Sequence, residues 1–97
     1  MKTVSEIKKI VREHNGILAQ RYGITVVGIF GSCVKGEARS GSDIDLLADI
    51  LRPISLLELV GAEIYLSEAL GAAVDLVPKR SVRDELRDTI LNEAVAV

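Results

Sequence analysis

Two aspartates that alternate within a short apolar run constrain the fold of this chain more than any other feature. Asp43 and Asp45 lie in the segment Asp-Ile-Asp-Leu-Leu-Ala, which is predicted to be a buried strand. Alternate residues of a strand point to the same face, so both carboxylates face one way with their Cα atoms roughly 6–7 Å apart. Like charges on one face of an apolar strand repel each other and lose hydration, so they require a counter-charge. A divalent cation is the simplest one.

A glycine-serine pair upstream of these acids has the composition of a phosphate-binding turn. The β-branched run Ile24 to Phe30 predicts a buried strand, which leads into Gly31-Ser32, and ten residues separate Ser32 from Asp43. A helix N-terminus after such a turn exposes backbone N–H groups to an anion, and the Ser32 hydroxyl can donate to a phosphate oxygen. Ser32 could instead only cap the following turn. The acids downstream favour the phosphate site.

A third carboxylate stands alone in a second apolar run. Asp75 lies within Ala72 to Val77, which is predicted to be a strand that ends before Pro78. Such a carboxylate either pairs with a base such as Arg52 or joins the other acids across adjacent strands. We favour the second arrangement because the paired aspartates already require a cation.

Three helices are predicted from capping residues and apolar periodicity. The first begins at Thr3 and ends at Gly23, the second runs from about Ser55 to Gly71, and the third begins near Ser81. The apolar faces of the second and third helices are expected to comprise Leu56, Leu59, Val60 and Ile64, and Leu86, Ile90 and Leu91, respectively.

The element order is therefore α-β-turn-β-α-β-α, with the second strand expected from Asp43 to about Leu51. This order predicts the α/β (α+β) class, a small mixed β-sheet flanked by helices. The first two strands are expected to pair like a hairpin across the Gly/Ser-rich segment.

Length and composition predict a single domain over residues 1–97 with a restricted set of partners. The 97 residues suffice for one core. The net charge of −2 argues against long nucleic acid, because a phosphate backbone is bound by clustered Lys and Arg. No apolar run approaches the ~20 residues of a membrane span, and the single Cys33 cannot form an internal disulfide. A cytoplasmic protein without a membrane partner is expected.

The pattern Gly-Ile-Phe-Gly-Ser, ten residues, then Asp-Ile-Asp resembles the nucleotidyltransferase superfamily related to DNA polymerase beta. It is most similar to the minimal (MNT) branch, whose small domains are often encoded beside HEPN-domain ribonuclease toxins. The resemblance implies the nucleotidyltransferase fold and assigns catalysis and metal binding to Asp43, Asp45 and Asp75. It also implies nucleotide binding by the loop residues Gly31, Ser32, Lys35, Arg39 and Ser42. Lys35 stands where relatives often have Arg, which keeps the charge but removes a bidentate fork.

The reaction implied by the resemblance uses two Mg²⁺ ions and ATP. One ion would be held by Asp43, Asp45 and Asp75 and would activate the acceptor hydroxyl; the other would be held by Asp43 and Asp45 at the leaving pyrophosphate. Attack on the α-phosphorus would transfer AMP, and Asp75 could also accept the proton of the acceptor. The base specificity rests on the resemblance alone, because no aromatic or Asn/Gln pair is placed to read adenine.

The resemblance leaves three functions open. In the first, the chain is an antitoxin that adenylylates a tyrosine hydroxyl on a HEPN-domain toxin. In the second it neutralises the toxin by binding alone, and in the third it modifies a small hydroxylated molecule. Val95 and Val97 are expected to be exposed and could contact a partner or a second copy of the chain, and His14 is expected to be a surface residue.

Overall fold

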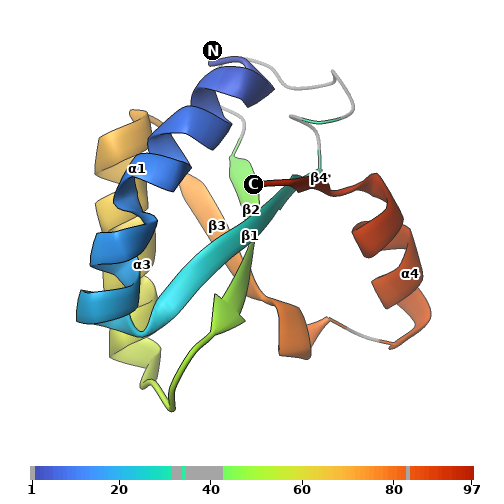
Figure 1. Cartoon of the computed structure of the whole chain (residues 1–97). Coiled ribbons are helices and arrows are strands. Elements are labelled where there is room, and N and C mark those ends of the chain that lie inside the picture. The colour runs from blue at the N-terminus through green and yellow to red at the C-terminus, as the bar shows by residue number, and fades with distance from the viewer. Residues whose placement is uncertain (1, 32–33, 35–42, 83) are drawn as a thin grey trace.

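A mixed four-stranded sheet lies at the centre of the computed structural model, which describes residues 2–31, 34, 43–82 and 84–97 (Figure 1). In this described part the strand order is β3-β2-β1-β4. β1 is antiparallel to β2 and to β4, whereas β2 and β3 are parallel. The expected class and the hairpin-like pairing of the first two strands are confirmed. The strands are β1 (Ile24–Phe30), β2 (Ile44–Ile50), β3 (Val74–Pro78) and β4 (Val95–Ala96).

The helices lie on both sides of this sheet (Figure 1). The helices α1 (Val4–Tyr22) and α3 (Leu56–Leu70) pack side by side against one face. The 3₁₀ turn η1 (Lys79–Ser81) follows β3 and precedes α4 (Asp84–Glu93), which lies apart from the other two helices. None of the helices in the described ranges is long and apolar enough to cross a membrane.

The ends of α1 and α3 are set by local hydrogen bonds that the sequence predicts. Thr3 and Ser55 each accept a bond from the backbone of the glutamate three residues on, and that glutamate bonds back to the cap. Each helix ends at a glycine in the left-handed region, with φ of 68° at both Gly23 and Gly71. Both capping boxes and both ends of these helices are therefore confirmed.

The sheet buries one face against α1 and α3 and leaves much of the other exposed. On β2, Ile44, Leu46 and Ala48 are buried, whereas Asp45 is half-buried and Asp49 is exposed. We call the side that carries Asp45 and Asp49 the open face. The buried residues that α1, α3, β1 and β3 add to the core are Ile7, Val11, Leu18, Ala62, Leu66, Leu70, Ile24, Val26, Ile29, Val74 and Leu76.

A bulge in β1 adjusts which of its residues face the core, and α1 stabilises it. The pairing of β1 with β2 shifts register between Val26 and Gly28, so that Ile29 as well as Val26 is buried. At this bulge the Asn15 side chain accepts from the Val26 backbone N–H at 2.9 Å and donates to the Val26 carbonyl at 3.2 Å. One amide side chain thus bonds both backbone groups of Val26 and joins α1 to β1.

The predicted apolar face of α3 is wrong. Leu56, Val60 and Ile64 are 76%, 40% and 56% exposed, and of the four predicted residues only Leu59 packs on the core. The helix is apolar on most sides, so more than one stripe has helical spacing. The stripe that the sheet and α1 bury comprises Ala62, Leu66 and Leu70.

Smaller corrections concern strand bounds and the C-terminal residues. β2 begins one residue later than expected and β3 begins at Val74 rather than Ala72. The sequence does not predict the strand β4; Val95 pairs with Ile29, and Val97 packs on the core instead of being exposed. In α4, Ile90 is half-buried, whereas the side chains of the other two predicted core residues, Leu86 and Leu91, lie outside what the structure describes.

His14 is also not the free surface residue that the sequence predicts. Its Nδ1 lies 2.6 Å from the hydroxyl of Tyr65, and the two rings meet edge to face with centroids 5.3 Å apart. The contact joins α1 to α3 through residues 51 positions apart, a separation that a helical pattern does not report.

Candidate active site

The sheet register places two of the predicted acids side by side. Asp45 on β2 pairs with Asp75 on the parallel strand β3, and on its other side it is opposite Phe30 of β1. Paired residues of neighbouring strands lie about 4.8 Å apart and point to the same face. Asp43, two residues before Asp45, has the same parity and comes just before β2 begins. All three acids therefore belong to the open face.

The electrostatics of Asp45 confirm that the acids are close to one another. Burial raises the pKa of Asp45 above its ordinary value, and the negative charges of Asp75 and then Asp43 raise it further. Asp43 and Asp75 are themselves exposed. The alternative partner for Asp75 is excluded, because the Arg52 guanidinium lies 3.0 Å from the Glu58 carboxylate near the start of α3. The acids repel one another, and a cation would relieve that repulsion.

The three carboxylates have the chemistry of a hard-cation site but are not arranged as one. Carboxylate oxygens are the ligands that Mg²⁺ and Mn²⁺ prefer. Among the described residues, however, no three His, Cys, Asp or Glu side chains are gathered closely enough to hold a metal ion. The acids are near enough to shift the pKa of Asp45, and their side chains would have to converge further to coordinate an ion.

Gly31 lies directly against this cluster. Its φ of 77° is in the left-handed region, and a Cβ placed on it would collide with the Asp45 carboxylate. The Gly31 carbonyl also accepts a bond of 3.2 Å from the Val34 backbone N–H, which closes a turn directly after β1. A glycine is required here both for the backbone conformation and for the close approach to Asp45. The beginning of the predicted phosphate loop thus adjoins the acids.

The other predicted nucleotide-binding residues lie outside the described part of the chain. These are Ser32, Lys35, Arg39 and Ser42. Their roles remain predictions from the motif. Asp49 shares the strand parity of the acids but is exposed at the far end of β2.

A pocket on the open face was missed by the sequence analysis. It has a volume of about 190 Å³ and is lined by Val27, Gly28, Leu47, Lys79, Ala94 and Ala96. The one signal in the sequence is Gly28, because a glycine inside a strand often marks a bulge or a close approach. The pocket depends on β4, which the sequence does not predict.

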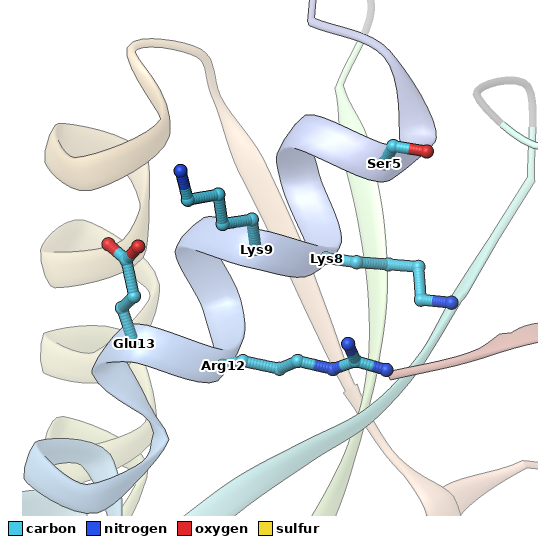
Figure 2. Close-up of a pocket in the computed structure, with 5 residues that line it drawn as sticks. All are labelled: Ser5, Lys8, Lys9, Arg12 and Glu13. Carbon is cyan, nitrogen blue, oxygen red and sulfur yellow. The ribbon is translucent and has the colours of Figure 1, made fainter.

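A second depression, of about 330 Å³, lies on α1 and has no catalytic character. It is lined by Ser5, Lys8, Lys9, Arg12 and Glu13. Lys8 and Arg12 extend to one side of the helix, while Lys9 and Glu13 extend elsewhere (Figure 2). The depression contains one carboxylate, and all of its lining residues belong to α1, which packs on the covered face of the sheet. We therefore assign the candidate active site to the open face.

Relatives with this sequence and fold are known. The Nucleotidyltransferase domain family matches residues 5–97. The protein adenylyltransferase MntA of Thermococcus cleftensis is 42% identical over 97 residues, which cover 100% of this chain and 98% of that protein. The candidate protein adenylyltransferase MJ1217 of Methanocaldococcus jannaschii is 49% identical over 84 residues, 87% of this chain and 86% of its own length.

Solved structures agree with the match to the nucleotidyltransferase domain family. The structure of a candidate minimal nucleotidyltransferase superposes with a TM-score of 0.76 at 36% identity and covers 95% of this chain and 94% of its own. A chain in the complex of a tri-AMPylated Shewanella oneidensis HEPN toxin with its MNT antitoxin has a TM-score of 0.65 at 19% identity, covering 93% of this chain and 70% of its own. At that identity the second likeness shows the fold alone. With the acids on the open face and Gly31 against them, the chain belongs to the nucleotidyltransferase domain family, in its minimal branch, and is a nucleotidyltransferase.

Proposed function

We propose that this chain transfers AMP from ATP to a tyrosine hydroxyl on a HEPN-domain toxin and thereby acts as its antitoxin. The observation that carries the proposal is the register of Asp45 beside Asp75, with Asp43 two residues away and Gly31 in contact with the cluster. The name of the Thermococcus relative supports an adenylyl group as the group transferred, and the name of the Shewanella complex supports a HEPN toxin as the class of partner.

We base the roles of the chain's own residues on the motif and, for the described residues, also on their positions. Asp43, Asp45 and Asp75 would hold magnesium, which when bound would offset the charge of the triphosphate and lower the pKa of the acceptor hydroxyl. Gly31 lets the backbone approach the nucleotide, and the loop residues Ser32, Lys35, Arg39 and Ser42 would bind its phosphates. Asp75 is the exposed acid of the pair and is the better placed to receive the acceptor's proton.

The reaction is a displacement at the α-phosphorus. The acceptor oxygen forms a bond to that phosphorus, the bond to the bridging oxygen of the β-phosphate breaks, and pyrophosphate leaves. Most of the rate comes from positioning and from stabilising negative charge, since the protein supplies little covalent chemistry.

The test is intact-mass spectrometry of a HEPN toxin co-expressed with the chain. We expect additions of AMP with the wild type and none with Asp45→Asn, a change that should lower the transfer rate by about 10²-fold or more. Asp49→Asn is the matched control, because Asp49 lies on the same strand and face but away from the cluster. Equal modification by wild type and Asp45→Asn would refute the proposed chemistry.

One observation favours a second function, neutralisation by binding alone. The exposed leucine, valine and isoleucine of α3 offer a protein partner an apolar surface, formed by Leu56, Leu57, Val60 and Ile64. If Asp45→Asn leaves the toxin unmodified but still inactive and bound, binding suffices. If the toxin regains ribonuclease activity, AMP transfer is required.

A further inference from the structure

The pocket on the open face lies next to the acids, one pair of residues farther along the strands. Asp45 and Asp75 form one row across the sheet with Phe30, and Leu47 and Val77 form the next row of the same parity with Gly28. Two residues of a strand span roughly 6–7 Å. Leu47 and Gly28 line the pocket, so its wall begins one such Cα spacing along the strands from the row of Asp45 and Asp75.

Gly31 lies at the opposite end of the same line. Along β1 and its extension the order is Gly28 at the pocket, Phe30 beside Asp45, and then Gly31 against the Asp45 carboxylate. Under the proposed function, the loop that starts at Gly31 binds the triphosphate. The acids therefore stand between the phosphate side and the pocket.

This order matters because phosphoryl and nucleotidyl transfer place the attacking and leaving oxygens roughly in line. The leaving pyrophosphate belongs to the side of Gly31. An acceptor oxygen that attacks from the opposite direction approaches from the pocket. The nucleobase is attached through the ribose and is under no such constraint.

The walls of the pocket suit an aromatic side chain that carries the hydroxyl. Val27, Leu47, Ala94 and Ala96 are apolar, and Lys79 provides the single charge among the lining residues. The volume of about 190 Å³ accommodates one planar ring. A phenol carries its hydroxyl beyond the ring and so toward the neighbouring row of acids, whereas a serine hydroxyl would require the partner's backbone to enter the pocket.

We propose that the pocket formed by Gly28, Leu47, Ala94 and Ala96 binds the ring of the acceptor tyrosine and directs its hydroxyl to Asp45 and Asp75. This subsite rests on the proposed function and adds to it the residues that select the acceptor. The phenol oxygen forms the new bond to the α-phosphorus, its proton passes to Asp75, and pyrophosphate leaves toward Gly31. Ala94 and Ala96 set the size of the pocket because larger side chains there would fill it.

The test fills the pocket without touching the acids. Ala96 is exposed on the short edge strand β4, so Ala96→Leu should fold while occupying the ring's place. Gly28→Ala is a milder second variant: Gly28 has no positive φ, and its new Cβ would lie 3.5 Å from the Ala94 Cβ, an ordinary contact. Gln20→Leu, which adds a leucine at an exposed position of α1, is the matched control.

The measurements are AMP transfer to a HEPN toxin and, separately, the dissociation constant of ATP. We expect Ala96→Leu to lower kcat/KM for the toxin at least tenfold, Gly28→Ala to lower it less, and both to leave the ATP constant within twofold. Gln20→Leu should match the wild type, and thermal unfolding should show that every variant is folded. A wild-type transfer rate in folded Ala96→Leu would overturn the inference, and so would a matching loss of ATP affinity, which would place the nucleobase in the pocket. Absence of transfer by the wild type itself would instead refute the proposed function.

Discussion

Replacing Gly31 by alanine should damage both the backbone and the acid cluster. At φ of 77° a Cβ is unfavourable, and this conformation costs about 1–2 kcal/mol for residues other than glycine. The new Cβ would also collide with the Asp45 carboxylate, which must therefore move. A catalytic group displaced by about 1 Å can cost about 10²-fold in rate. We expect Gly31→Ala to lose stability by at least the backbone cost and activity by about two orders of magnitude.

Gly71→Ala separates these two effects. Gly71 has nearly the same conformation, φ of 68°, but the nearest neighbour that its new Cβ would meet is the flexible Lys2 side chain, with Nζ 3.9 Å away. This variant should show the backbone cost alone, a fall in Tm of about 5–15 °C for a domain of this size, with AMP transfer per folded molecule unchanged. Thermal unfolding and transfer assays on both variants make the comparison. If folded Gly31→Ala transfers AMP as fast as Gly71→Ala, the contact between Gly31 and Asp45 plays no part in catalysis.

Three further predictions use other parts of the chain. Because burial and like charge raise the pKa of Asp45, the folded protein holds a proton there more tightly than the unfolded chain does. The free energy of unfolding measured without added metal should therefore fall as pH rises from about 3.9, the ordinary pKa of Asp, through the raised pKa of the folded protein. Urea titrations of Asp45→Asn should lack this fall. Identical pH profiles for the wild type and Asp45→Asn would contradict the prediction. Asn15→Ala should cost about 1–3 kcal/mol in urea unfolding because the two backbone groups of Val26 lose their partner, and a loss below about 0.5 kcal/mol would show that water replaces the amide. The double substitution Leu56→Ser and Ile64→Ser should change the free energy of unfolding by less than about 0.5 kcal/mol, since both side chains are mostly exposed, and yet weaken toxin binding in calorimetry; unchanged binding would exclude this surface from the interface.

The parts of the fold that the sequence predicts correctly are those encoded by neighbouring residues. The capping boxes at Thr3 and Ser55 and the terminal glycines Gly23 and Gly71 act through hydrogen bonds within a few residues. Their geometry follows from the chemistry of the cap and from the freedom of glycine to adopt a positive φ. These signals do not depend on what the helix packs against, so they can be interpreted without the tertiary structure.

The errors concern contacts between distant residues. In α3 the apolar side chains surround most of the helix, so periodicity could not tell the exposed Leu56 and Ile64 from the buried Leu66. The bond between His14 and Tyr65 joins two helices, and β4 is a strand of two residues that exists because it pairs with β1. In each case the deciding partner is far away in the sequence.

The candidate site combines both kinds of information. Strand parity was enough to predict that Asp43 and Asp45 share a face, because the period of two is intrinsic to a strand. Parity could not decide between Arg52 and the other acids as neighbours of Asp75. That choice depended on the parallel register of β3 with β2, which places Asp75 beside Asp45.

The two faces of the sheet therefore have different roles, one in stability and the other in the proposed activity. The covered face holds the described core and the Asn15 bridge, and substitutions there should act on stability. The open face carries carboxylates that repel one another and raise the pKa of Asp45, an arrangement that lowers the stability of the fold near neutral pH. Neutralising Asp45 should then stabilise the folded protein while abolishing transfer. Such a gain in stability with a loss of activity is expected of a residue that serves a functional site. If the Asp45 carboxylate served only the structure, neutralising it would instead lower the stability of the protein.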